Sequence, residues 1–252
     1  MQDQTPLTET VLGDSPGPFR VGVLALANDQ VIERDLGLLL PPEVLTFTTR
    51  IAFGGDCTME QLAKMVPQLA EAAQLLNPEV ALDAVIFGCT SGTIAIGPET
   101  IRDAIQSVSP GALAVNPVEA ASGALRHLGA RRINLVTPYE FEIADRMAAQ
   151  FEAAGFAINR RFDFGITASE DISRVRPEAI LEAAARLGGE GAEATFISCT
   201  DFQSLEVLER IETETGMPTV SSNQAMAWDI LASLGVTGGV PGYGRLLREL
   251  PN

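Results

Sequence analysis

The chain has 252 residues, 46% of them hydrophobic, and a formal net charge of −16 from 33 acidic and 17 basic residues. This length suits one large domain or two small ones, each with its own core. The acidic balance repels phosphate groups, so we expect neither nucleic acid nor an anionic membrane as a partner. The chain has one histidine, His127, and one lysine, Lys64. These counts argue against a multi-histidine metal site, a histidine-bearing catalytic triad and a Schiff-base enzyme.

The three cysteines are an odd number and do not predict a secretory disulfide framework. The first residues are polar and lack the basic start of a signal peptide, and the apolar run at 21–27 is too short to span a bilayer. We therefore expect a cytoplasmic protein. Residues 1–18 are polar, aperiodic and rich in Pro and Gly, which predicts a flexible tail.

Short apolar segments alternate with amphipathic ones along the rest of the chain. Strands are expected near 20–26, 84–88, 113–115, 133–136, 195–198 and 219–221. Helices are expected near 59–76, 98–107, 118–128, 141–154, 177–187, 205–215 and 224–234. Strands that read as continuous hydrophobic runs and are followed by helices predict an α/β fold with parallel sheets.

Three blocks of sequence recur at offsets of 106 to 112 residues (20 to 132, 89 to 199, 128 to 234). The clearest pair is 84–90, AVIFGCT, and 194–200, ATFISCT. A near-constant offset predicts a duplicated α/β unit. We expect a flexible tail at 1–18, a first half at 19–116 plus 224–252, and a second half at 117–223, with a site in the cleft between the halves.

Each half ends a buried strand with Cys-Thr, at Cys89 and at Cys199. Ligands of open α/β sheets bind beyond the carboxyl ends of strands, and a helix beginning there favours a thiolate. A lone thiol at such a point is more often packing than chemistry, but its recurrence in the repeat favours a pair of opposed catalytic cysteines. The hydroxyls of Thr90 and Ser91 are candidates to hold a substrate carboxylate. Cys57 has no counterpart in the second half and is interpreted as structural.

Several motifs together resemble one known superfamily. They are Gly88-Cys89-Thr90-Ser91-Gly92, Val136-Thr137-Pro138-Tyr139, Ser198-Cys199-Thr200-Asp201, Ser221-Ser222-Asn223-Gln224-Ala225 and Gly242-Tyr243-Gly244-Arg245-Leu246. The chain resembles the aspartate/glutamate/hydantoin racemase superfamily over nearly its whole length after the tail. It is most similar to the branch of maleate cis-trans isomerases, arylmalonate decarboxylases and the racemase-like proteins of ectoine utilisation. Within that branch it resembles the ectoine-utilisation proteins most.

The resemblance implies two flavodoxin-like halves related by a pseudo-twofold axis. It also implies a small carboxylate substrate between two cysteines, Cys89 and Cys199, with no metal or organic cofactor. Substrate-binding positions carried over on the motifs are Asp29, Thr90, Ser91, Tyr139, Ser169 and Thr200. Two depart from the maleate isomerase pattern, because Asp29 and Ser169 stand where that pattern has asparagine. An anionic Asp29 would repel a second substrate carboxylate, which favours a substrate with one carboxylate and a neutral or cationic group.

The leading hypothesis is an isomerase or racemase that acts on a small carboxylate through its two cysteines. One alternative is a protein that binds a small carboxylate without catalysis, and another is a lyase or decarboxylase that uses Cys199 alone. We expect the chain to form a homodimer. The glycine-rich segment 238–244 is interpreted as a loop over the cleft, with Arg245 meeting a carboxylate or a backbone carbonyl. Ser222-Asn223 is interpreted as a helix cap, with a substrate contact by Asn223 as the second choice.

Overall fold

Two parallel four-stranded sheets form the frame of the molecule, described here from a computed structural model over residues 17–76 and 79–250. The first contains β1 (Phe19–Leu26), β2 (Val44–Ile51), β3 (Ala84–Gly88) and β4 (Leu113–Val115) in the order β2-β1-β3-β4. The second contains β5 (Arg132–Tyr139), β6 (Ala157–Ile166), β7 (Ala194–Ile197) and β8 (Thr219–Ser221) in the order β6-β5-β7-β8. The two orders are the same once the second half is renumbered, so the predicted pair of similar α/β halves is confirmed.

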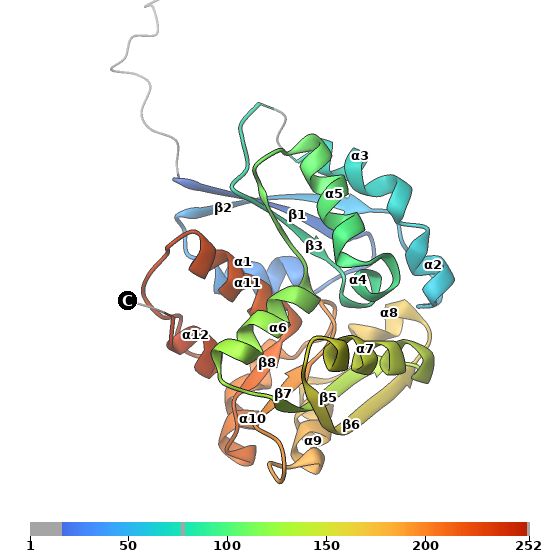
Figure 1. The fold of residues 1–252 in the computed structure, drawn as a ribbon, viewed down its shortest axis with the longest axis vertical. Coiled ribbons are helices and arrows are strands. Elements are labelled where there is room, and N and C mark those ends of the chain that lie inside the picture. The colour runs from blue at the N-terminus through green and yellow to red at the C-terminus, as the bar shows by residue number, and fades with distance from the viewer. Residues whose placement is uncertain (1–16, 77–78, 251–252) are drawn as a thin grey trace, which may run out of the picture.

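Helices connect the strands in both halves (Figure 1). The first half holds α1 (Ile32–Leu39), α2 (Met59–Ala63), the 3-10 turn η1 (Val66–Gln68), α3 (Leu69–Gln74), α4 (Thr90–Ile96) and α5 (Pro98–Val108). After α6 (Pro117–His127) come α7 (Phe141–Ala153), α8 (Ser169–Ile172), α9 (Pro177–Leu187), η2 (Leu205–Val207), α10 (Leu208–Thr215), α11 (Ser222–Ser233) and α12 (Arg245–Arg248). None of these helices in the described part of the chain is long and apolar enough to cross a membrane.

The strands differ in burial, and this difference explains which of them the sequence predicts. Every residue of β3 and β7 is buried, as their continuous apolar runs require. The expected strands omit β2 and β6, which are the edge strands beside β1 and β5. Both are half-exposed along most of their length and carry polar residues, so neither gives the apolar run of a buried strand.

Helix boundaries also depart from expectation in two places. The expected helix at 59–76 is broken into α2, η1 and α3 because Pro67 removes a backbone donor within it. The expected cap at Ser222-Asn223 is wrong by one residue. Ser221 is the N-cap of α11, and its side chain and that of Gln224 form a reciprocal capping box.

The two halves meet along α6 and α11, which pack against each other between the two sheets (Figure 1). His127 ends α6, as the sequence predicts, and its ring lies 5.2 Å from that of Trp228 on α11. The boundaries at 19–116 plus 224–252 and 117–223 remain our proposal for the two units. Most of the expected tail, residues 1–16, lies outside the described residues.

Candidate functional site

The site is built at the carboxyl ends of the central strands of both sheets. Asp29 follows β1, Cys89 follows β3, Tyr139 ends β5 and Cys199 follows β7. In a parallel α/β sheet these ends share one edge, and side chains from neighbouring strand ends come together there. Because the two halves present this edge to each other, residues more than 100 positions apart line one cavity.

Cys89 is the N-cap residue of α4, and the helix start positions its sulfur. The Sγ atom accepts a hydrogen bond from the Gly92 backbone N–H at 3.1 Å. A Cβ at position 92 would lie 2.9 Å from that sulfur, so glycine permits the close approach. The hydroxyl of Ser91 lies 3.6 Å from the same sulfur, within hydrogen-bonding distance. These donors would stabilise a thiolate at Cys89.

Cys199 lies in an unusual backbone conformation. Its φ of 113° makes it the one non-glycine residue with positive φ in the described part of the chain. Such a conformation costs about 1–3 kcal/mol and persists only where the surroundings impose it. Here the Cys199 N–H donates to Ser222 Oγ at 3.0 Å, and the Thr90 hydroxyl donates to the same oxygen at 2.9 Å.

Burial governs the protonation of both thiols. It raises the pKa of Cys89 to about 12, against the opposing effect of the Ser91 and Gly92 hydrogen bonds. Burial and the nearby Asp201 raise the pKa of Cys199 well above its usual value, and interaction with Tyr139 opposes this only in part. The expectation that the helix start favours a thiolate is therefore outweighed, and both cysteines are neutral thiols at pH 7.

Both cysteines line the same small cavity, of about 30 Å³, which has room for about two water molecules. Of the predicted site residues, all but Thr90 line it. The full lining is Leu26, Asn28, Asp29, Phe53, Cys57, Cys89, Ser91, Tyr139, Ser169, Ile172, Cys199, Thr200 and Asp201. The Thr90 hydroxyl donates instead to Ser222 Oγ, which also accepts from the Cys199 N–H, and a substrate contact by Thr90 stays a prediction.

Four buried polar atoms on this lining have no hydrogen-bond partner in the protein. They belong to Asn28 (Oδ1), Asp29 (Oδ2), Tyr139 (Oη) and Asp201 (Oδ2). Buried polar groups are normally paired, and an unpaired one costs about 1–3 kcal/mol. Their gathering at one cavity, beside two thiols, is the structural sign of a site that receives a polar ligand.

Three polar or thiol side chains on the lining were not predicted as site residues from the sequence. Cys57, interpreted as structural, lies 3.6 Å from the Ser91 hydroxyl, which is also 3.6 Å from Cys89. Asn28 donates through its amide to Ser169 Oγ at 3.0 Å, a contact between the two halves. Asp201 accepts from the Gln30 backbone N–H at 2.7 Å, a second such contact. The signal for Asp201 was in the sequence, since it follows Cys199-Thr200 directly.

Two loops from opposite halves cover the cavity. The backbone of Cys57 donates to the Thr167 carbonyl at 2.8 Å, and Ser169 N–H donates to the Gly55 carbonyl at 3.1 Å. Asp56 and Ala168 form an isolated antiparallel bridge between the same loops. These contacts join the two halves at the edge of the cavity, beside Cys57 and Ser169, which line it.

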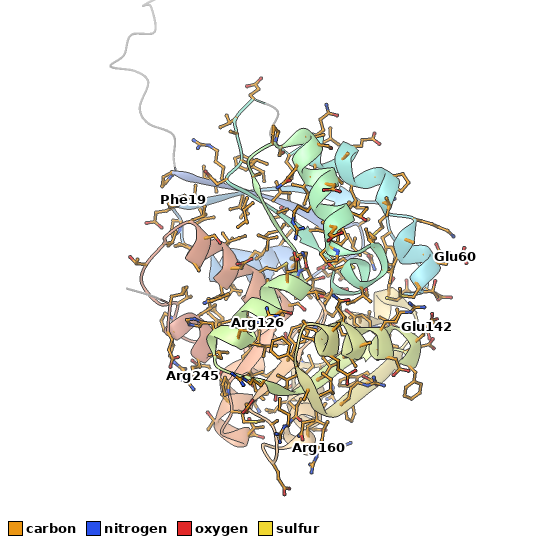
Figure 2. The ribbon with its side chains drawn as sticks, viewed as in Figure 1. Phe19, Glu60, Arg126, Glu142, Arg160 and Arg245 are labelled. Carbon is orange, nitrogen blue, oxygen red and sulfur yellow. The ribbon has the colours of Figure 1, made fainter. Side chains whose placement is uncertain are left out.

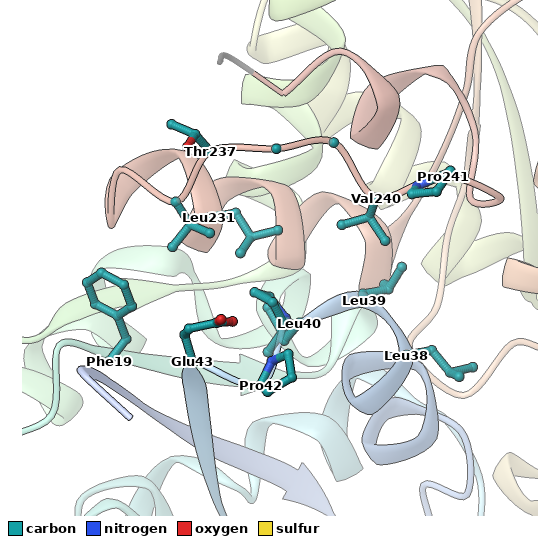
Figure 3. A pocket seen from close by; sticks show the side chains of 14 residues that line it. Phe19, Leu38, Leu39, Leu40, Pro42, Glu43, Leu231, Thr237, Val240 and Pro241 are labelled. Atoms are coloured by element: carbon teal, nitrogen blue, oxygen red, sulfur yellow. The ribbon is translucent and has the colours of Figure 1, made fainter. Parts of the chain in front are cut away.

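Other features singled out in the sequence lie elsewhere. The segment 238–244 does not cover the cysteine cavity. Residues 238–241 instead line a separate hollow of about 720 Å³ (Figure 3), whose one ionisable side chain is Glu43. Arg245 lies on α12 at the outer edge of the molecule (Figure 2), paired with Glu249 at 2.8 Å. Asn223 is buried and donates to Asp35 and to the Thr200 carbonyl, so it supports the site from behind.

The family model for arylmalonate decarboxylase matches residues 55–247 of the chain. The chain belongs to the arylmalonate decarboxylase family. A maleate isomerase from Nocardia farcinica (strain IFM 10152) is 30% identical over 246 residues, covering 92% of this chain and 97% of the relative. A maleate isomerase from Geobacillus stearothermophilus is 25% identical, covering 91% and 97%.

Solved structures of this arylmalonate decarboxylase family have the same fold. The maleate cis-trans isomerase of Nocardia farcinica, as a cysteine-to-serine mutant with a covalently bound succinylcysteine intermediate, matches with a TM-score of 0.84 and 26% identity over 92% of this chain and 98% of that one. A maleate isomerase from Pseudomonas putida S16 with maleate matches with a TM-score of 0.84 and 21% identity, covering 91% and 97%.

Proposed function

We propose that this protein is a cofactor-independent isomerase of a small carboxylate, with Cys89 and Cys199 as its two reacting groups. The observation that carries the proposal is that these cysteines, one from each half, line one buried cavity with unpaired polar atoms. Two relatives that span nearly the whole chain, at 30% and 25% identity, are maleate isomerases. The succinylcysteine in one related structure supports chemistry through a cysteine sulfur.

The environments of the two thiols support different roles for them. Cys89 is the nucleophile, because the Gly92 amide and the Ser91 hydroxyl can stabilise negative charge on its sulfur as it forms. Cys199 is the acid, because burial and the neighbouring Asp201 keep its proton in place. Tyr139 lies beside Cys199 with its hydroxyl unpaired and is placed to contact the substrate.

For an unsaturated substrate such as maleate, Cys89 first gives its proton to solvent, so that the reactive form has Cys89 as thiolate and Cys199 as thiol. The Cys89 sulfur forms a bond to one alkene carbon, and the neighbouring carbon takes the proton of Cys199. The former double bond is now single and rotates. Cys199 then removes a proton from that carbon, the double bond re-forms, and the bond to sulfur breaks to restore the Cys89 thiolate.

Racemisation is the second candidate, and the acidic lining favours it. Asp29 and Asp201 both line the cavity, a poor environment for the second carboxylate of a dicarboxylate. A substrate with one carboxylate and an amino or amide group fits this lining better. One thiolate would then remove the proton beside the carboxylate, and the opposite thiol would return a proton to the other face.

A decarboxylase that uses Cys199 alone is not favoured. The family model carries that activity in its description, and decarboxylases of the resembled branch keep the second cysteine only. This chain has both, and the first is held by dedicated donors from Gly92 and Ser91. A protein that binds a carboxylate without chemistry would have no use for that arrangement.

We further propose a homodimer located in the cytoplasm. Three unpaired cysteines are compatible with a reducing compartment. Trp228 is half-buried on α11, and part of its aromatic side chain remains exposed, which suits a residue at a subunit interface. Analytical ultracentrifugation of the wild type beside Trp228→Ala tests the dimer, since a monomeric wild type contradicts it.

Proton NMR in D₂O tests the function directly. The panel is maleate, maleamate, aspartate, glutamate and diaminobutyrate with its N-acetyl forms. Conversion of a cis alkene to its trans isomer identifies the addition–elimination route, and loss of an α-proton signal from either enantiomer identifies racemisation. Turnover by wild type that persists in Cys89→Ala would instead indicate a reaction that needs Cys199 alone.

A further inference from the structure

Two buried carboxyl groups meet in the cavity, one from each half of the molecule. Asp29 and Asp201 are 4% and 7% exposed, and both line the cavity. Oδ1 of Asp29 accepts from the Val31 and Ile32 amides, each at 2.9 Å, and Oδ1 of Asp201 accepts from the Gln30 amide at 2.7 Å. Oδ2 of each has no other partner in the protein. The backbone therefore fixes one oxygen of each carboxyl and leaves the other free.

Each of the two side chains lies close enough to shift the pKa of the other, and the Thr200 side chain also lowers the pKa of Asp29. Burial and the neighbouring Asp29 raise the pKa of Asp201 to about 8, and burial also raises the pKa of Asp29. Asp201 therefore keeps its proton at pH 7, because a second negative charge beside Asp29 is disfavoured.

No cationic side chain lines the cavity to offset this charge. Among the groups around the pair, Arg50 donates to the Asp29 backbone carbonyl and lowers the pKa of Asp201, but it does not reach the lining. Arg34 is paired with Asp35 at 2.9 Å, and burial and the neighbouring Asp29 raise the pKa of Asp35. The other titratable groups on the lining are the thiols of Cys57, Cys89 and Cys199 and the hydroxyl of Tyr139, and burial raises the pKa of each of them.

We propose that Asp29 and Asp201 act as a specificity-determining pair. They select a substrate that carries an N–H donor, an amino or amide group, where a dicarboxylate would carry its second carboxylate. A donor satisfies the free Oδ2 atoms, whereas a carboxylate brings a like charge against acceptors. The proposal deepens the proposed function, because it takes this cavity to be the substrate site.

Isothermal titration calorimetry with succinate and succinamate tests the preference. These ligands are nearly equal in size and differ by one carboxylate replaced by an amide, and neither has a double bond for the cysteines to attack. We expect wild type at pH 7 to bind succinamate at least tenfold more tightly than succinate. Equal or tighter binding of succinate overturns the proposal, and so does binding of neither ligand.

Substitution of either acid tests whether the pair causes the preference. Asp29→Asn supplies an amide N–H that can donate to a substrate carboxylate, so we expect at least a tenfold loss of the preference for succinamate. Asp201→Asn provides the same test if Asp29→Asn does not fold. Asp229→Asn, a partly buried acid on α11 outside the cavity, is the control with the same change in net charge and is expected to retain the wild-type preference. An unchanged preference in both site variants overturns the proposal.

The binding test also separates this inference from the proposed function. Ligand preference needs no turnover, so a correct preference with no isomerase or racemase activity would count against the function alone. Activity that depends on both cysteines, together with a preference for succinate, would count against the acid pair alone. Raising the pH from 7 to 9 should weaken succinate binding further in the wild type, because the pair loses its proton, and should not do so in Asp29→Asn.

Discussion

At the scale of single residues, two cysteines with the same neighbour in sequence have different surroundings. Cys89 caps a helix, and its sulfur accepts a hydrogen bond from the Gly92 backbone N–H. Cys199 has a positive φ and lies beside Tyr139 and Asp201. The repeated Cys-Thr predicts that both cysteines lie in one site. It does not predict their protonation, because burial depends on how the two halves close over them, and the local helix start has the smaller effect.

Burial of Cys89 makes a direct prediction for its titration. A raised pKa of about 12 means that the thiol keeps its proton through neutral pH. The difference in ultraviolet thiolate absorbance between wild type and Cys89→Ala should therefore stay near zero from pH 6 to pH 9. A thiolate step below pH 8 would show that the helix start outweighs burial after all.

At the scale of elements, the repeat and the continuous apolar runs predict the central strands well. The expected segments at 84–88, 113–115 and 219–221 coincide with β3, β4 and β8. Edge strands β2 and β6 are not predicted from the sequence, because their half-exposed residues do not form the continuous apolar run of a buried strand. The short helix α4 is not predicted either, because its sequence TSGTIAI has few strong helix formers. It is helical because of its tertiary contacts and its N-cap at Cys89.

The loop that carries Gly55 offers a test of how the cavity closes. Gly55 has a φ of 86° and accepts the Ser169 amide, so alanine there adds about 1 kcal/mol of strain at the crossing of the two loops. We expect Gly55→Ala to raise KM several-fold and to speed amide hydrogen exchange at Cys57 and Ser169. The loss of overall stability should not exceed this strain, because a Cβ at Gly55 meets no atom within 4 Å.

Gly54→Ala is the matched control for that loop. Its added Cβ also meets no atom within 4 Å, and its φ lies outside the strained region. It should leave KM and hydrogen exchange close to the wild-type values. If both alanine variants behave alike, the strained conformation of Gly55 has no part in closing the cavity.

At the scale of the whole molecule, the site exists only where the two halves meet. Asn28 contacts Ser169, Gln30 contacts Asp201, and the Thr200 hydroxyl donates to the Gly88 carbonyl at 3.2 Å. The duplication predicts that two such halves face each other. It cannot predict the individual contacts, such as Cys57 entering the lining, because these depend on the relative placement of loops from both halves.

Ser222 joins three parts of the molecule at one oxygen. It begins α11, accepts from the Thr90 hydroxyl of the first half, and accepts from the Cys199 N–H of the second. Ser222→Ala leaves that buried N–H unpaired, so we expect a loss of about 1–3 kcal/mol in the free energy of unfolding and a lower kcat. Urea denaturation and steady-state kinetics measure these effects.

Ser107→Ala is the comparison for that variant. Its exposed hydroxyl donates only to the Ala104 carbonyl within α5. We expect a change below about 0.5 kcal/mol and an unchanged kcat. Equal effects of the two serine substitutions would mean that the junction at Ser222 does not support Cys199.

The turnover of single-cysteine variants tests the central claim, that catalysis needs Cys89 and Cys199 together. On whichever substrate the wild type converts, Cys89→Ala and Cys199→Ala should each lose at least a thousandfold in kcat, with melting temperatures near that of the wild type. Cys57→Ala, which removes the third thiol of the cavity, should retain turnover. Near wild-type turnover in either Cys89→Ala or Cys199→Ala would contradict the account.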